Sequence, residues 1–231
     1  MKNPKRIKEN RDPRNSIQVD KNHYFNLLYD TKERWSSYWY QIHEVLEQNP
    51  QSILEIGVGN KTVSDYLRKV GIKVTTCDFD KGLKPDVVGS VLNLPFDNNS
   101  FDLILCAEVL EHLPFSEFQS ALKEIQRVTR SKVIISLPHM SLTHFYIGGK
   151  LIPFIAKAEA MLKIDFPLAR QFDGEHYWEI GERGYSLNKV VKSLQGSGFK
   201  VQKTYYPSEN PRHQFFILQK EIKQIGKTPK T

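Results

Sequence analysis

Residues 53–60, with the sequence ILEIGVGN, join a short apolar run to a turn that contains two glycines. The apolar run predicts a buried strand over residues 52–56, and the spacing of the apolar residues that follow predicts a helix over residues 63–70. Gly57 and Gly59 have no Cβ atom, so the backbone between strand and helix can approach a ligand closely. The amide groups of this turn and the N-terminus of the helix then form a polar, slightly positive rim.

Asp78 follows Gly57 by 21 residues and ends a second predicted strand over residues 72–77. In open α/β sheets an acidic residue at this place accepts hydrogen bonds from ribose hydroxyls. The turn and Asp78 together therefore indicate a nucleoside ligand. A dinucleotide site has a third small residue where this chain has Thr62. The Glu55 carboxylate would repel a pyrophosphate but suits an ammonium group, so the site favours a cationic amino-acid nucleoside over NAD.

Strand and helix patterns alternate through residues 51–138, with strands expected over residues 52–56, 72–77, 86–88, 101–107 and 132–137. Strands separated by helices form a parallel sheet that is covered on both faces. Two final strands, over residues 199–206 and 213–219, flank a five-residue loop that can join only antiparallel neighbours. We therefore predict an α/β fold with three layers, whose mostly parallel sheet has an antiparallel last strand.

Three further helices are predicted from apolar spacing. The first covers residues 31–48, and the face expected to pack in the core contains Trp35, Trp39, Ile42 and Leu46. We favour this core packing over the alternative that Trp35, Tyr38 and Trp39 close over the ligand. The second begins at a capping box formed by Ser116 and Gln119. The third covers residues 187–194.

The net charge of +7 comes mainly from the two ends of the chain. Residues 1–20 have six basic and three acidic residues, and residues 219–231 have four lysines and one glutamate. We predict a mobile basic arm over residues 1–20, one domain over residues 21–219 and a basic tail over residues 220–231. Within the domain, we expect a ligand-binding core over 51–138, a lid or substrate insertion of one or two helices over 139–185, and a terminal helix and hairpin over 186–219.

Composition limits the location and the partners of the protein. The chain is 39% hydrophobic, which excludes a disordered polymer, and it has no apolar run long enough for a membrane span or a signal segment. Cys77 and Cys106 cannot form a disulfide framework. These features favour a cytoplasmic protein. We expect the basic ends and the lysines of residues 150–163 to be solvated, rather than to bind a nucleic acid or contact a membrane surface.

Several stretches together resemble a known family: EIGVG at 55–59, Asp78, LNLPFDNNSFD at 92–102 and EVLEHL at 108–113. They are similar to the class I S-adenosylmethionine-dependent methyltransferases, and most similar to their small-molecule, type 11-like branch. The resemblance covers residues 51–138. It implies a Rossmann-like, seven-stranded sheet, S-adenosylmethionine as cofactor, and methyl transfer to an oxygen or nitrogen nucleophile of a small molecule by in-line displacement.

By position in the family's motifs, the resemblance also implies a set of cofactor-binding residues: Glu55, Gly57, Gly59, Asp78, Phe79, Ser90, Val91, Leu92 and Glu108. In this assignment Glu55 engages the ammonium group, Asp78 takes the ribose hydroxyls and Phe79 packs against the adenine. Glu108 begins the stretch beneath the reactive sulfonium. Ser90 stands where many relatives have an acidic residue for the adenine amino group.

The candidates for acceptor chemistry are histidines and one aromatic residue. His112, His139 and His144 are candidate bases or substrate contacts, and His176 and Tyr177 are candidate substrate contacts; a structural role remains open for each. No metal is expected, because methyl transfer from a sulfonium needs none and the histidines show no H-x-x-x-H spacing. Three rival interpretations remain: an NAD-dependent oxidoreductase, a non-catalytic S-adenosylmethionine-binding protein, and an RNA-binding enzyme that uses the basic ends.

Overall fold

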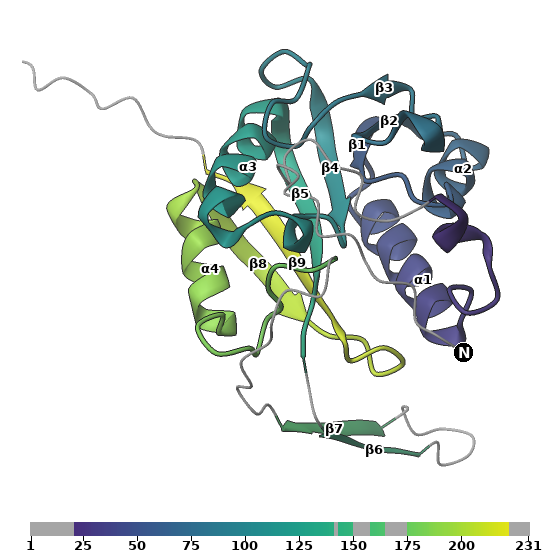
Figure 1. Cartoon of the computed structure of the whole chain (residues 1–231), viewed down its shortest axis with the longest axis vertical. Helices are drawn as coiled ribbons and strands as arrows, with labels where there is room; N and C mark the ends of the chain where they lie inside the picture. The colour runs from purple at the N-terminus through teal and green to yellow at the C-terminus, as the bar shows by residue number, and fades with distance from the viewer. Residues whose placement is uncertain (1–20, 141–142, 150–157, 165–174, 222–231) are drawn as a thin grey trace, which may run out of the picture.

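The computed structural model describes residues 21–140, 143–149, 158–164 and 175–221. Its centre is a seven-stranded sheet in the order β3-β2-β1-β4-β5-β9-β8 (Figure 1). The strands are β1 Ser52–Ile56, β2 Lys73–Asp78, β3 Val87–Val88, β4 Phe101–Ala107, β5 Thr129–Pro138, β8 Phe199–Tyr205 and β9 His213–Lys220. All neighbours pair in parallel except those of β9, which runs against both β5 and β8. The predicted fold class and the antiparallel last strand are confirmed.

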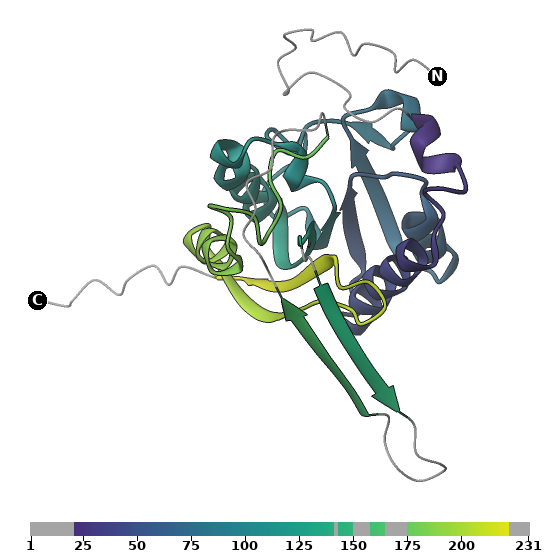
Figure 2. The same cartoon turned by 60° about the horizontal axis from the view of Figure 1, so that its bottom comes forward.

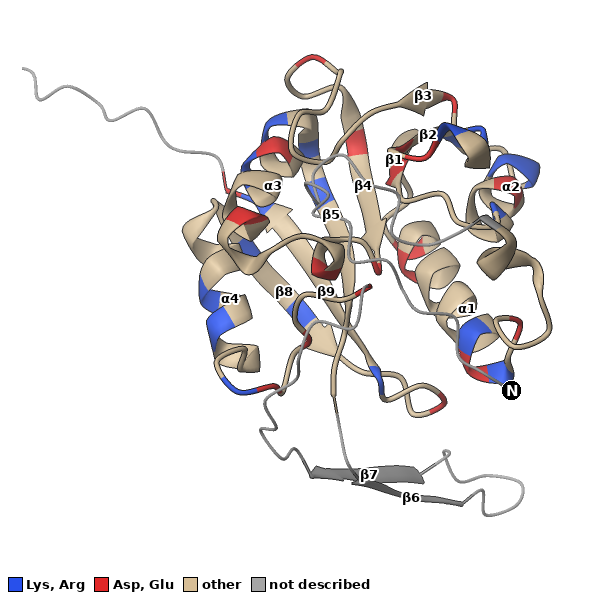
Figure 3. Ribbon diagram, in the orientation of Figure 1, with Lys and Arg blue, Asp and Glu red and all other residues tan. Residues whose placement is uncertain are grey.

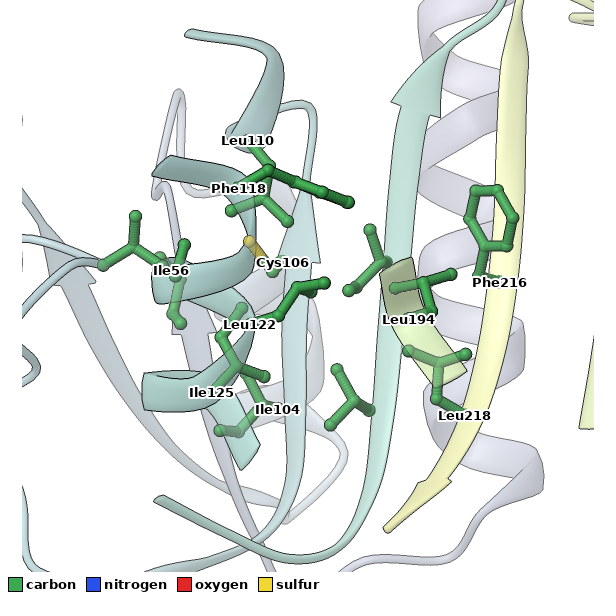
Figure 4. Packing of buried hydrophobic residues seen from close by; sticks show 14 of the residues in the cluster. Ile56, Ile104, Cys106, Leu110, Phe118, Leu122, Ile125, Leu194, Phe216 and Leu218 are labelled. Carbon is green, nitrogen blue, oxygen red and sulfur yellow. The ribbon is translucent and has the colours of Figure 1, made fainter. Parts of the chain in front are cut away.

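Helices cover both faces of this sheet. They are α1 Lys32–Glu47, α2 Thr62–Lys69, α3 Phe115–Val128 and α4 Leu187–Gly196. In β4, Leu103 and Leu105 pack with α1 and α2, whereas Ile104 and Cys106 pack with α3 and α4 (Figure 4). Successive side chains of a strand point to opposite faces, so the apolar run of β4 fills two cores at once.

The predicted core face of α1 is wrong. Trp35 and Trp39 are 51% and 56% exposed, whereas Ser37, Gln41 and Glu44 are buried. The buried Ser37 and Glu44 side chains are tolerated because distant residues bond to them. The Glu44 carboxylate, for example, accepts hydrogen bonds from Lys203 and Tyr205 on β8.

The predicted capping box of α3 is also wrong. The helix begins at Phe115, with Pro114 as its N-cap and no side-chain capping bond. Ser116 therefore lies inside the first turn. At this end of the helix the Glu117 N–H donates to the Pro114 carbonyl at 2.8 Å, so a backbone bond closes the first turn.

Residues 139–185 do not form the predicted helices where the structure describes them. β6 Thr143–Gly149 and β7 Ala158–Ile164 pair as an antiparallel hairpin outside the main sheet, and Figure 2 shows the hairpin extending away from that sheet. The aromatic and β-branched residues of β6 favour a strand. Among the described residues, no helix combines the length and the apolar character needed to cross a bilayer.

Candidate functional site

A cavity of about 210 Å³ lies beyond the carboxyl ends of β1, β2 and β4. Its lining comes from the turn after β1, the end of β2, the residues after β3 and the residues after β4. The strand order reverses between β1 and β4, which is where open α/β sheets bind their ligands. Acidic residues stand at the ends of these strands and on the turn after β4 (Figure 3). The site therefore suits a ligand with positive charge.

The turn after β1 requires glycine at its first position. Gly57 has a φ of +82°, and a Cβ atom there would lie 2.3 Å from Cγ2 of Val109. Gly59 has a φ of +47° and would direct a Cβ toward the Tyr24 ring, 3.7 Å away. Both glycines line the cavity. The turn thus brings bare backbone to the cavity wall, as the sequence predicted.

Asp78 is held in place by main-chain amides. Its Oδ2 accepts a hydrogen bond from the Val58 N–H at 2.8 Å, and its Oδ1 accepts one from the Asp80 N–H at 2.8 Å. Burial raises the pKa of this carboxyl above its usual value. Each carboxylate oxygen can accept more than one hydrogen bond, so Asp78 can also receive hydroxyl donors from a ligand in the cavity.

Glu55 is the least satisfied carboxylate around the glycine turn. Its side chain is 5% exposed, and Oε2 has no hydrogen-bond partner among the described residues. Burial raises the pKa of Glu55 to about 8. A buried carboxylate oxygen without a partner is costly, and a cationic group in the cavity would reduce that cost.

Glu108, after β4, is fixed from two sides. Its Oε1 accepts a hydrogen bond from the Ser136 hydroxyl at 2.8 Å, and its Oε2 lies 3.5 Å from Nε2 of His213. Burial lowers the pKa of His213, whose Nδ1 lies 2.8 Å from the Ser37 hydroxyl. Glu108 lines the cavity with a φ of +54°, so a strained backbone directs this carboxylate.

Residues 21–41 contribute a wall of which the sequence analysis considered only Tyr38, as its less favoured alternative. Tyr24, Tyr29, Arg34, Tyr38 and Gln41 line the cavity. The Arg34 guanidinium lies 4.5 Å from the centre of the Tyr29 ring, which in turn packs edge-on against Tyr24. The aromatic residues of an otherwise polar segment were the available signal. Their contacts with the glycine turn depend on the tertiary fold.

All predicted cofactor-binding residues line the cavity except Leu92, which packs against the core formed with α3 and α4. Of the predicted histidines whose side chains the structure describes, only His112 lines it. His139 is buried beside the main sheet and does not line the cavity, and its Nδ1 lies 3.0 Å from Oε1 of Gln214 on β9.

The remaining predicted contacts lie elsewhere. His144 falls on β6, whose side chains lie outside the described part of the structure. His176 and Tyr177 are not among the lining residues, but the His176 ring packs against that of His112 with 4.9 Å between the ring centres.

Comparison with known proteins agrees with this geometry. Residues 54–137 match a family model described as a methyltransferase domain. Demethylmenaquinone methyltransferase of Corynebacterium efficiens is 31% identical over 96 residues, which is 38% of this chain and 41% of that protein. The enzyme of the same name from Thermotoga maritima is 26% identical over 68% of this chain and 73% of its own length. The chain spans about a quarter to a half of the length of several curated relatives that it matches.

Solved structures show the same fold. The 1,6-didemethyltoxoflavin-N1-methyltransferase of Burkholderia thailandensis, with bound S-adenosylhomocysteine, superimposes with a TM-score of 0.58 at 13% identity and covers 87% of this chain and 84% of its own. A methyltransferase from Clostridium acetobutylicum gives a TM-score of 0.57 at 15% identity, covering 86% of this chain and 96% of its own. The resemblance found in the sequence and the Rossmann-like fold are confirmed.

Proposed function

We propose that this chain, which carries a methyltransferase domain over residues 54–137, uses S-adenosylmethionine to methylate a small molecule. The observation that carries the proposal is the buried Glu55 carboxylate oxygen, which has no partner among the described residues and belongs to a cavity wall beside a bare glycine turn. An α-ammonium group is a suitable partner for it. The fixed Asp78 carboxylate in the same cavity supplies the acceptor that ribose hydroxyls need.

We assign the cofactor to the chain's residues as follows. Gly57 and Gly59 would lie against its amino-acid part, Asp78 would take the ribose hydroxyls, and Phe79 and Val91 would pack against its adenine. When bound, S-adenosylmethionine supplies a methyl group on a good leaving group, a sulfonium. The task left to the protein is to align an acceptor with that group and to keep water away.

The acceptor side of the cavity is assigned to Glu108 and His112. Both line the cavity after β4, and Glu108 is already oriented by Ser136 and His213. Tyr24 and Tyr38, from the N-terminal wall, would cover the site and exclude water. We propose an oxygen or nitrogen nucleophile as the methylated atom.

The named relatives support a small-molecule acceptor. Their names refer to demethylmenaquinone, 1,6-didemethyltoxoflavin and magnesium protoporphyrin IX, which are three unrelated small molecules. A common fold that serves such different acceptors says little about which one this chain takes. The proposal is therefore limited to the class.

Calorimetry with S-adenosylhomocysteine tests the cofactor assignment. The wild-type chain should bind it with a Kd in the micromolar range, and Asp78→Ala should weaken binding by about tenfold or more, which is about 1.4 kcal/mol. Asp65→Ala is the matched control, because this aspartate lies on the exposed side of α2 and outside the cavity. Equal affinities of Asp78→Ala and wild type, or tighter binding of NADH than of S-adenosylhomocysteine, would contradict the assignment.

A further inference from the structure

A second group of side chains, which includes His112 and could bind a metal ion, lies next to the cavity. One potential ligand atom from each of Glu111, His112 and His176 lies within 4.8 Å of the others. Only His112 of the three lines the cavity itself. The cofactor assignment above uses neither Glu111 nor His176.

The Glu111 carboxylate is the strongest indication that this group of side chains binds a cation. Its side chain is 0% exposed, and neither carboxylate oxygen has a hydrogen-bond partner among the described residues. An ionised carboxylate in such a place is costly unless a cation compensates it. The nearby charge of Glu108 increases that cost.

The two histidine rings each have an oxygen acceptor next to Nδ1. Nδ1 of His112 lies 3.0 Å from the carbonyl oxygen of Glu175, and Nδ1 of His176 lies 2.9 Å from Oε1 of Glu179. Both partners are acceptors, so each Nδ1 carries the proton and each Nε2 presents a lone pair. A carbonyl or carboxylate behind the ring is the usual outer support of a metal-binding histidine.

Hydrogen bonds and aromatic packing hold these residues close to one another. The Tyr177 N–H donates to the Glu111 carbonyl at 2.9 Å, and the indole N–H of Trp178 donates to the Leu113 carbonyl at 3.1 Å. Trp178 is 1% exposed and packs edge-on against the ring of Phe118. The segment that carries His176 is therefore fastened to η4 (Leu110–His112) by backbone bonds and an aromatic anchor.

We propose that Glu111, His112 and His176 form a binding site for a divalent transition-metal ion such as Zn²⁺. Two imidazoles and one carboxylate suit such ions, whereas Mg²⁺ and Ca²⁺ prefer oxygen ligands only. Ligand atoms about 2.1 Å from one ion stand at most about 4.2 Å apart. The observed limit of 4.8 Å therefore requires only small side-chain movements on binding.

An ion at this place would also bear on the acceptor, a part of the inference that rests on the proposed function. Sites with two histidines and one carboxylate keep a coordination position open. Because His112 lines the cavity, that position would face it and bind an oxygen atom of the acceptor. This narrows the acceptor to a molecule with a hydroxyl or carbonyl oxygen near the methylated atom.

The test is a titration of the untagged, chelator-treated full chain with Co²⁺, followed by calorimetry and by visible absorption, with no S-adenosylmethionine present. We expect one Co²⁺ per chain in the wild type. Glu111→Gln and His176→Gln should weaken binding by about a hundredfold or more, and Glu179→Gln by about ten- to a hundredfold. His43→Gln, a histidine on α1 that stacks on Trp39, should bind as the wild type does.

Absence of saturable Co²⁺ binding in the wild type, or unchanged affinity in both Glu111→Gln and His176→Gln, would overturn the site. Circular dichroism identifies a variant that fails to fold; the half-buried His176 then decides the question in place of the buried Glu111. Since no cofactor or acceptor is present, loss of the metal site leaves the cofactor assignment standing. Failure of S-adenosylhomocysteine binding would likewise leave the Co²⁺ result intact.

Discussion

The cavity has two sides that are built in different ways. At the ends of β1 and β2, main-chain N–H groups of the glycine turn and of Asp80 donate to the Asp78 carboxylate, all within one strand-helix-strand unit. After β4, the functional side chains come from η4 and from a segment far along the chain, and buried carboxylate oxygens of Glu111 have no partners among the described residues. The first side is a local motif with its geometry set. The second is assembled from residues that lie far apart in the sequence.

The largest expected effect comes from replacing Trp178, the aromatic anchor, and we expect it to alter only the side of the cavity after β4. Trp178→Ala should lower the free energy of unfolding by about 3–5 kcal/mol, because it empties a fully buried site. It should also weaken Co²⁺ binding, yet leave the Kd for S-adenosylhomocysteine within about twofold of wild type. Denaturant unfolding and calorimetry measure both.

Trp39→Ala is the control for that variant. Trp39 is 56% exposed, so its removal should change the free energy of unfolding by no more than about 0.5 kcal/mol. A parallel loss of cofactor affinity in Trp178→Ala at temperatures where the chain is folded would show that the two sides are not independent.

Gly57→Val should disrupt the glycine turn on the first side of the cavity. The added side chain would meet Val109 and would have to adopt a left-handed backbone. We expect S-adenosylhomocysteine affinity to fall by about a hundredfold or more, which is about 2.7 kcal/mol. Gly71→Val is the matched control: Gly71 has a φ of +92° but nothing within 4 Å of an added Cβ atom. Equal cofactor affinities of these two variants would argue against close backbone approach at Gly57.

Glu55 gives a pH-dependent test of the same side. Because burial raises its pKa from 4.5 to about 8, the folded chain holds the proton more tightly than the unfolded chain does. The free energy of unfolding should therefore fall as the pH rises between these two values, by about 1.4 kcal/mol per pH unit from this group. Glu55→Gln should remove that part of the slope in ligand-free protein.

Glu47→Gln, an exposed position on α1, is the control for the pH series. A bound ammonium group should favour the ionised form of Glu55, so S-adenosylhomocysteine binding near pH 7 should release a proton in the wild type and less in Glu55→Gln. Calorimetry in buffers of different ionisation enthalpy measures this. An identical proton release in both proteins would place the ammonium elsewhere.

The smallest effect distinguishes two residues that the sequence analysis both assigned to the cofactor site. Phe79 is 41% exposed and lines the cavity, whereas Leu92 packs into the core. Phe79→Ala should weaken S-adenosylhomocysteine binding by about 0.5–1.5 kcal/mol through lost ring contacts. Leu92→Ala should lower stability and leave affinity unchanged; the reverse pattern would favour the original assignment of Leu92.

The contrast between the two sides also explains what could be predicted from the sequence. Gly57 and Asp78 were found because strand periodicity, turn chemistry and their separation along the chain determine their relation. The same local signals located β4 and the terminal hairpin. All of these features depend on neighbours in sequence or on adjacent strands.

The errors arose where distant residues decide the outcome. Apolar spacing selected the Trp35 and Trp39 face of α1, but partners on β8 and β9 allow Glu44 and Ser37 to be buried instead. The pairing of His176 with His112 depends on the Trp178 anchor, and no pattern in the sequence specifies that contact. The burial of His139 away from the cavity also depends on a distant residue, because its partner Gln214 belongs to the last strand.

A crystal structure of the chain with S-adenosylhomocysteine tests the central claim most directly. We expect Asp78 to keep its bonds to the Val58 and Asp80 amides and to accept the ribose hydroxyls as well, with the ammonium group within about 3 Å of the Glu55 carboxylate. A ligand bound outside this cavity, or an Asp78 carboxylate without any sugar contact, would contradict the account.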